Sequence, residues 1–197
     1  MASSKKATSK VTPRLEVKKT YKLYINGAFP RSESGRVYEV SNSKGGFIAN
    51  PSLASRKDLR DAVVAARAAH SGWAKATAYN RGQILYRIAE MMEGRADQFT
   101  AEISLASGVT LKKAQDEVAA AIDRWVWYAG WSDKLSAAFG ATNPVSGPYY
   151  NFTIPEPQGV IAVAPAESFL SLIDAIAPAI VSGNSVVALV PGSAAIA

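Results

Sequence analysis

The sequence predicts an α/β protein whose parallel sheet is incomplete. Its middle part, residues 55–139, carries apolar residues at the spacings of three and four that are typical of amphipathic helices. Closer to the C-terminus, two continuous apolar runs at 159–164 and 185–190 flank one apolar helical segment. Such runs are typical of strands buried on both faces, and strand, helix, strand is the right-handed unit of a parallel sheet. Because two strands leave both sheet edges open, we expect either a part of a longer protein or a partner that supplies further strands.

The positive charge of the chain is confined to its beginning. The formal net charge is +6, and residues 1–22 carry seven Lys or Arg against one Glu, so the remaining 15 basic and 15 acidic residues balance. A Ser-, Lys- and Thr-rich opening is typical of a solvated end, so we predict a disordered basic tail over residues 1–20. A weak electrostatic contact or an organelle address is the alternative. We expect no nucleic-acid partner.

The composition excludes several kinds of site. The chain has no Cys and a single His, His70, so it offers no disulfide, no cysteine nucleophile and no multi-histidine metal site. It also lacks the Gly-Lys-Ser/Thr phosphate loop and the Gly-x-Ser-x-Gly nucleophile motif. No apolar run has the length of a membrane span or the place of a signal peptide, so we expect no membrane partner. Nothing requires an oxidising compartment, and we expect a cytoplasmic protein.

The N-terminal part predicts a hairpin turn at Asn26 and Gly27. Alternating apolar residues at 21–25 precede this Asn-Gly pair, which is the strongest short-range hairpin signal. Residues 41–52 are rich in Gly, Ser, Asn and Pro, so we predict a loop there.

Capping residues divide the segment 55–139 into helices, which we predict to form one antiparallel packet. Glycines end these helices, and Ser, Thr or Asn begin them. The predicted boundaries are Ser55 with Asp58 for the first start, Asn80 with Gln83 for the second, Gly94 for its end, Ala96 to Gly108 for the third helix, and Thr110 to Leu135 for the fourth.

Side chains in this packet that could carry chemistry are interpreted as structural. His70 lies on the apolar stripe of the first helix, near its end, where a core-facing or dipole-satisfied His is far more common than a catalytic one. Four aromatic residues follow at helical spacing, where core and interface packing is more common than a stacking platform. They are Trp125, Trp127, Tyr128 and Trp131.

The paired acids of the fourth helix are predicted to be surface ion pairs. Asp116 and Glu117 follow Lys112 and Lys113 by four residues, which is the spacing of neighbours on a helix surface.

The turn between the first apolar run and the following helix is the place where a dinucleotide-binding motif would lie. In doubly wound sheets a ligand's phosphates approach the helix that follows the first strand, over a glycine-rich turn. Here residues 165–169 contain no glycine, and Glu167 introduces a negative charge. The turn alone is therefore weak support for a nucleotide site.

The order of these parts resembles a known family. The resemblance rests on Ile25-Asn26-Gly27, the helical packet, Glu156-Pro157-x-Gly159-Val160, Ala177-Pro178-Ala179 and Gly183-Asn184-x-Val186-Val187. Together they resemble the N-terminal part of the aldehyde dehydrogenase superfamily over residues 20–193. The resemblance implies a Rossmann-like domain that binds NAD or NADP, an oligomerisation hairpin around residues 147–155, and a catalytic domain that follows. It also implies assembly with itself or with an aldehyde-dehydrogenase-like paralogue.

The chain departs from the family at positions that carry function. Where the family has Pro-Trp-Asn-Phe-Pro, whose Asn helps to form the oxyanion hole, this chain has Pro165, Ala166 and Glu167. Where the family has a Lys and a Glu around a proline that reach the cofactor's ribose, this chain has Val190, then Pro191, and no such polar groups. Only Pro165 and Pro191 match by position and are the candidate cofactor-binding residues. We predict no catalytic residue in this chain.

The resemblance leaves three hypotheses open. The chain is the N-terminal portion of an NAD(P)-dependent aldehyde dehydrogenase and inactive alone, or a non-catalytic interaction or regulatory subunit (a pseudoenzyme), or a short protein that pairs through its open sheet. Downstream sequence with a Cys and a Glu would favour the first. The expected organisation is a tail at 1–20, a hairpin and helical packet at 21–139, an oligomerisation-type extended segment at 140–158, and the first β-α-β unit of the cofactor domain at 159–197.

Overall fold

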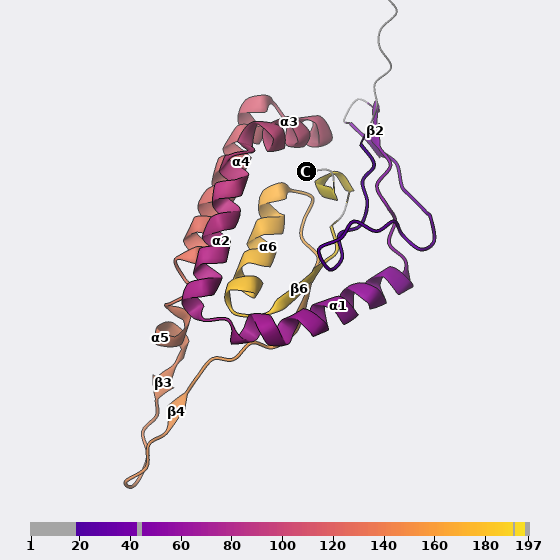
Figure 1. Ribbon diagram of the computed structural model, residues 1–197. Coiled ribbons are helices and arrows are strands. Elements are labelled where there is room, and N and C mark those ends of the chain that lie inside the picture. The colour runs from indigo at the N-terminus through magenta and orange to yellow at the C-terminus, as the bar shows by residue number, and fades with distance from the viewer. Residues whose placement is uncertain (1–18, 43–44, 191, 196–197) are drawn as a thin grey trace, which may run out of the picture.

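The computed structural model describes residues 19–42, 45–190 and 192–195 of the chain. Its helices are α1 (Arg56–Lys75), α2 (Ala78–Glu93), α3 (Ala96–Ser107), α4 (Leu111–Ala129), α5 (Leu135–Phe139), α6 (Phe169–Val181) and the short 3-10 helix η1 (Gly192–Ala195). Its strands are β1 (Val40–Ser41), β2 (Phe47–Ala49), β3 (Ala141–Thr142), β4 (Phe152–Thr153), β5 (Val160–Val163) and β6 (Ser185–Ala188). Figure 1 shows helices gathered around α6, an extended N-terminal segment on the opposite side, and a hairpin of β3 and β4 that projects from the body.

The predicted strand–helix–strand unit is confirmed. β5 and β6 pair in parallel, with Val160 opposite Ser185 and Val163 opposite Ala188, and α6 connects them. The prediction that both strands are buried on both faces is wrong, because Val187 is their single buried residue. Within the described residues no third strand joins this sheet, so its outer edges keep part of their surface exposed.

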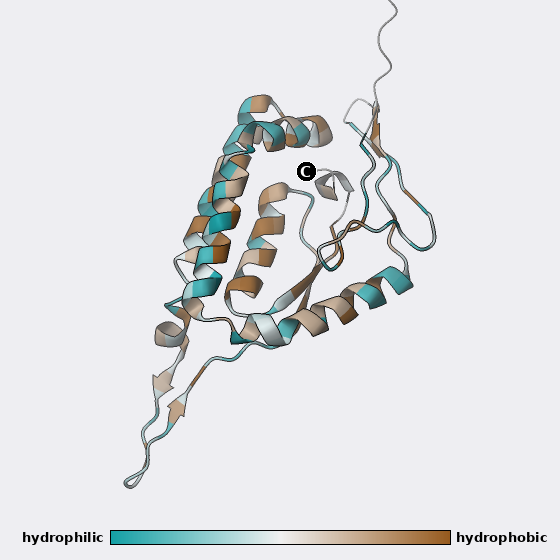
Figure 2. Ribbon diagram, viewed as in Figure 1, coloured by the Kyte–Doolittle hydropathy of each residue, from teal (hydrophilic) through white to brown (hydrophobic). Residues whose placement is uncertain are grey.

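The core lies between α2, α4 and α6, with α3 packed across α4. Leu85 and Val118 are fully buried at its centre. Ala114, Ala121 and Ala177 have no exposed surface, and their small side chains allow the helices to approach closely. Figure 2 shows the hydrophobic colouring concentrated on α6 and on the two parallel strands beside it.

The first helix is not part of this packet, which corrects the prediction of one packet over residues 55–139. α1 packs along β6 and β5 instead. Its apolar stripe is incompletely covered, and Leu59 keeps 42% of its surface exposed. The apolar periodicity predicted the helix correctly but not its packing partner. A helix has the same apolar stripe whether it packs on a sheet or on other helices.

Capping explains where the helices begin. Ser55 and Asp58 form the predicted capping box of α1. The second helix starts earlier than predicted, because the Thr77 side chain accepts the hydrogen bond from the backbone N–H of Asn80. α3 ends at Gly108, whose φ of 70° is the left-handed cap conformation that glycine adopts readily.

The fourth helix begins after Thr110 as predicted but ends at Ala129, six residues before Leu135. A turn over residues 130–134 precedes the separate helix α5. This turn seats the buried Ser132 against Gly82 of α2, where a side chain larger than hydrogen would overlap the Ser132 hydroxyl. The helix is therefore interrupted at the place where the turn packs against α2.

The Asn26-Gly27 turn is confirmed. Both residues have positive φ, 54° and 73°, and Ile25 and Ala28 exchange backbone hydrogen bonds of 3.0 and 3.1 Å across the turn. The prediction of a loop over residues 41–52 is wrong in part, because β2 lies inside it and pairs antiparallel with β1. Ile48 and Ala49 are buried there beside Val40, a contact that the surrounding Gly, Ser and Asn residues conceal in the sequence.

The predicted tail over residues 1–20 lies outside the described residues except for its last two. No helix within the described ranges combines the length and the apolar character needed to cross a lipid bilayer.

Candidate functional site

The candidate cofactor site is the edge of the sheet at which β5 and β6 end. Both strands are parallel, so the turn after β5 and the turn after β6 leave from the same edge. The backbone N–H of Leu189 donates a 2.9 Å hydrogen bond to the Val163 carbonyl, which joins the C-terminal ends of the two strands. Pro165 is half-buried in the first turn, whereas Pro191, the other candidate, lies outside the described residues.

The N-terminal end of α6 faces this edge and is already capped. Ser168 is the N-cap, and its hydroxyl accepts a 3.0 Å hydrogen bond from the backbone N–H of Ser171. A second cap comes from α4, because the Glu117 carboxylate accepts a 3.1 Å hydrogen bond from the N–H of Leu170. A carboxylate is the side chain that the positive end of a helix dipole favours.

The role of Glu117 corrects the sequence interpretation. Asp116 does form the predicted surface ion pair with Lys112, at 2.7 Å. Glu117 is half-buried and bonds to α6 instead of forming an ion pair with Lys113. Its position, three residues after Ala114 on the buried stripe, was the signal in the sequence that it borders the core.

A second carboxylate stands in the turn itself. The Glu167 carboxylate lies so close to the Gly192 backbone that a Cβ at Gly192 would overlap it. The Tyr38 hydroxyl reaches the same place and donates to the Gly192 carbonyl at 3.5 Å. Burial raises the pKa of Tyr38, and the negative charge of Glu167 raises it further, so the phenol stays a protonated donor. Sequence reasoning missed Tyr38, because 154 residues separate it from Gly192.

The shared motifs at the opposite edge of the sheet have a structural explanation. The Asn184 side-chain oxygen accepts a 2.9 Å hydrogen bond from the Gly159 N–H, which joins the Glu-Pro-x-Gly and Gly-Asn segments. Gly183 has a φ of 89°, and a Cβ there would lie 2.8 Å from the Pro157 ring. These residues set the register between β5 and β6, and they face the edge away from the candidate cofactor turns.

His70 and the aromatic cluster form no catalytic arrangement among the described residues. The buried Nδ1 of His70 has no hydrogen-bond partner there. Trp125 is buried in the core as predicted, whereas Trp127 is 53% exposed. The ring centroid of Trp127 lies 4.8 Å from that of Tyr128 and 5.6 Å from that of Trp131. The described part of the chain also holds no group of three acidic or His side chains that could bind a metal ion.

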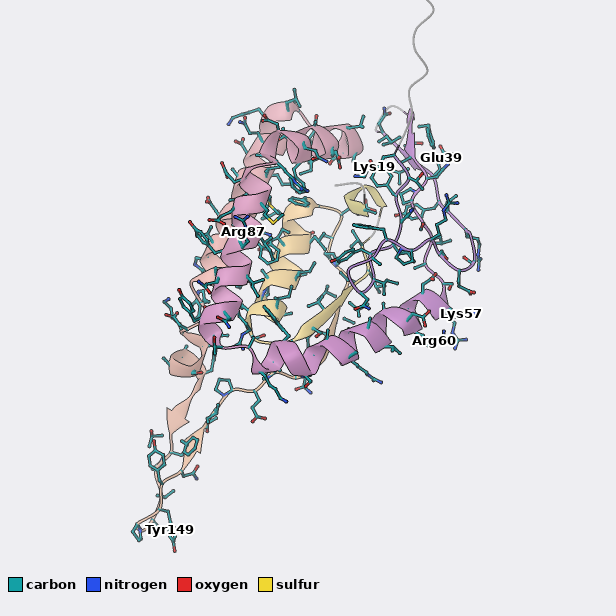
Figure 3. The ribbon with its side chains drawn as sticks, viewed as in Figure 1. Lys19, Glu39, Lys57, Arg60, Arg87 and Tyr149 are labelled. Atoms are coloured by element: carbon teal, nitrogen blue, oxygen red, sulfur yellow. The ribbon has the colours of Figure 1, made fainter. Side chains whose placement is uncertain are left out.

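The hairpin of β3 and β4 forms a second candidate site. Asn143 fixes it through side-chain hydrogen bonds of 3.1 Å to Asn151 and 3.0 Å to Thr153. Its apolar side chains are among the most exposed of the described residues: Tyr149 (74%), Tyr150 (77%), Phe152 (52%) and Ile154 (61%). Tyr149 lies at the tip (Figure 3). A shallow hollow of about 370 Å³ separates the hairpin from α5.

Comparison with known proteins identifies the family. The family model described as "Aldehyde dehydrogenase family" matches residues 29–194. The chain belongs to the aldehyde dehydrogenase family. Human retinal dehydrogenase 2 is 38% identical over 183 residues, which cover 89% of this chain and 35% of the relative. An aldehyde dehydrogenase of Emericella nidulans is 34% identical over 180 residues, covering 89% of this chain and 36% of the relative.

Solved structures support the same assignment. An aldehyde dehydrogenase of Bacillus cereus superposes with a TM-score of 0.80 at 26% identity, over 89% of this chain and 38% of that one. PnpE, solved in complex with nicotinamide adenine dinucleotide, superposes with a TM-score of 0.81 at 26% identity, over 86% of this chain and 35% of that one. The chain thus spans about a third of the length of the curated relatives it matches. The predicted incomplete α/β fold of this aldehyde dehydrogenase family member is confirmed.

The residues at the candidate cofactor edge do not fit the phosphates of a dinucleotide. A phosphate at a helix N-terminus needs backbone N–H donors that no other acceptor uses. Here Leu170 and Ser171 donate to Glu117 and Ser168, and Glu167 adds a further negative charge in the adjoining turn. The backbone N–H groups of Leu170 and Ser171 are therefore unsuited to hold the phosphates of a dinucleotide.

Proposed function

We propose that this chain is an association part of an aldehyde dehydrogenase family protein and is catalytically inactive by itself. The projecting hairpin carries the proposal, because large apolar side chains on it remain exposed to water. Contiguous exposed apolar surface of this kind is typical of a protein–protein interface. The partner is a second copy of the chain or an aldehyde-dehydrogenase-like paralogue.

The geometry of the hairpin supports this role. Within the part of the chain that the structure describes, β3 pairs only with β4, so the outer edges of both strands offer backbone groups to a further strand. Tyr150 and Phe152 form a ring pair at 5.3 Å beside the hollow that separates the hairpin from α5. Exposed aromatic side chains that line a hollow are well suited to anchor an interface.

The inactivity follows from the composition. Aldehyde oxidation in the family, as the resemblance implies it, passes through a covalent thiohemiacetal on a cysteine, and this chain has no Cys. The family's oxyanion-hole Asn is replaced by Glu167, whose negative charge opposes an oxyanion.

The hairpin proposal is tested by sedimentation of the 197-residue chain and of Tyr150→Ser/Phe152→Ser. We expect the chain to sediment as a dimer or larger assembly and the variant to dissociate at the same concentration. The matched control is Tyr24→Ser/Phe29→Ser, because Tyr24 and Phe29 are also exposed and pair at 5.2 Å. Equal dissociation of both variants would contradict a specific role for the hairpin. A monomeric wild type that also fails to capture an aldehyde-dehydrogenase-like paralogue would contradict the proposal as a whole.

A second function applies to the whole protein. Family membership and the coverage of about a third of each relative favour an NAD(P)-dependent aldehyde dehydrogenase whose remaining sequence supplies the nucleophile. The intact mass of the native protein tests it, detected with an antibody against α2 and α4. A mass well above 20.9 kDa, with a Cys in the remainder and aldehyde-dependent reduction of NAD or NADP, supports the enzyme. A mass of 20.9 kDa contradicts it and favours the non-catalytic subunit. A cytoplasmic location remains our prediction.

A further inference from the structure

A glutamate carboxylate from α4 caps the N-terminal end of α6, and a second glutamate directly precedes the N-cap residue. Glu117 reaches it from α4 and accepts the Leu170 N–H at 3.1 Å. Glu167 stands one residue before the N-cap Ser168, with its carboxylate against Gly192. The two glutamates come from segments about 50 residues apart, so the tertiary fold brings this pair together.

Among the described residues these two carboxylates have no ion-pair partner. Over residues 19–42, 45–190 and 192–195, no Lys or Arg forms an ion pair with Glu117 or Glu167. Arg124, on the same helix as Glu117, forms an ion pair with Asp174 at 3.2 Å. An anion that approached this helix end would therefore meet unpaired like charge, at a place where a helix dipole ordinarily attracts it.

Two backbone donors of this helix end are also committed. Ser171 donates its N–H to Ser168, and Leu170 donates to Glu117. A phosphate or carboxylate ligand would have to displace a neighbouring carboxylate whose attachment to α4 keeps it at the helix end. Displacement inside the chain is harder than displacement of a free anion, because the effective concentration of a tethered group is high.

We infer that Glu117 and Glu167 together close the N-terminal end of α6 to anionic ligands, Glu117 by taking a backbone donor and Glu167 by its charge. Both act by position and neither is a catalytic residue. If the whole protein binds NAD or NADP, the phosphates contact other residues. The inference is independent of the hairpin and of the oligomeric state.

The test uses inorganic pyrophosphate as the probe and the amide NMR signals of Leu170 and Ser171 as the readout, at low ionic strength. We compare the 197-residue chain with Glu117→Ala/Glu167→Ala, which frees the Leu170 donor and removes both charges. We expect no saturable shift in the wild type and a saturable shift in the double variant, since two nearby like charges are removed and the Leu170 N–H is freed. The matched control is Glu93→Ala/Glu156→Ala, which makes the same change of net charge at exposed positions and should behave as the wild type.

Two results would overturn the inference. One is a saturable shift of these amides in the wild type, and the other is a double variant that responds no more strongly than the control. Should the double variant fail to give a folded spectrum, Glu167→Ala alone removes an exposed carboxylate. At the same pyrophosphate concentration, that single variant should give amide shifts about threefold larger than those of the wild type, and an unchanged response would contradict the role of Glu167.

Discussion

The indole N–H of Trp73 donates a 2.9 Å hydrogen bond to the carbonyl of Ile180, 107 residues away in the sequence. This bond ties α1 to the last turn of α6, where the final carbonyls of a helix lack partners within the helix. Arg81 acts beside it, with a 3.0 Å hydrogen bond from its Nε to the Val181 carbonyl. Two side chains from separate helices thus cap the C-terminal end of α6.

Trp73→Phe keeps an aromatic ring and removes this donor. We expect a loss of about 1 kcal/mol in the free energy of unfolding, because the Ile180 carbonyl loses a partner in a partly buried place. Thermal and denaturant unfolding measure it. Trp127→Phe is the matched control, since its ring is 53% exposed, and it should cost less. Equal losses would show that ring size and not the hydrogen bond matters.

The stability of the chain should fall in acid through Asp58. Burial raises the pKa of this carboxyl, but hydrogen bonds from Ser55, Ser32 and Glu33 outweigh it and lower the pKa to about 2. The folded-state value lies below the unfolded one, so the contribution is complete above pH of about 4 and is lost as the pH falls toward about 2. We expect Asp58→Asn to remove on the order of 1 to 2 kcal/mol at neutral pH and to flatten the unfolding free energy over that window.

The control for Asp58 is Asp61→Asn, which changes an exposed carboxylate on the same helix. Its pH profile should follow the wild type. A profile of Asp58→Asn that keeps the full acid dependence would contradict the assignment.

Two helical glycines should respond oppositely to alanine. Gly72→Ala in α1 meets no atom within 4 Å and should stabilise by up to about 1 kcal/mol, since alanine favours helix. Gly82→Ala in α2 would overlap the Ser132 hydroxyl and lie 3.1 Å from the Ala129 carbonyl, so it should destabilise by about 1–3 kcal/mol. Urea unfolding measures both. Adding Ser132→Ala should recover part of the loss, and no recovery would place the strain elsewhere.

Asn184 should be needed for its acceptor oxygen. Asn184→Ala leaves the Gly159 N–H without its 2.9 Å partner, and we expect a loss of about 1–3 kcal/mol. Asn184→Asp keeps the acceptor and should retain more of the stability. The comparison is made by thermal unfolding, and an aspartate as damaging as alanine would disprove the role of the oxygen.

The sequence predicted the elements whose signals are local. The caps at Ser55 and Thr110, the left-handed Gly108 and the Asn26-Gly27 turn each act within a few residues, and the structure has them where expected. The parallel pairing of β5 with β6 followed from their apolar runs and the intervening helix.

Features that depend on distant contacts were missed. The placement of α1 on the sheet, the cap from Glu117 and the approach of Tyr38 to Gly192 all join segments far apart in the chain. β2 was missed for another reason, since three residues are too few for an alternating pattern to emerge from a Gly- and Ser-rich surrounding. Of the candidate site, the charge of Glu167 was visible in the sequence, but its contact with Gly192 was not.

The composition of the main core has a consequence for how the chain folds during synthesis. The buried residues of that core all lie between Leu85 and Val181, and none of them belongs to β5 or β6. Contacts among the successive helices α2, α3 and α4 are the closest in sequence and form quickly, because little chain entropy is lost in bringing them together. Once Val181 has left the ribosome, α6 can dock on α2 and α4 before β6 has emerged. The parallel strands then pair against a helical layer that is already folded, so their slower pairing does not limit the assembly of the core.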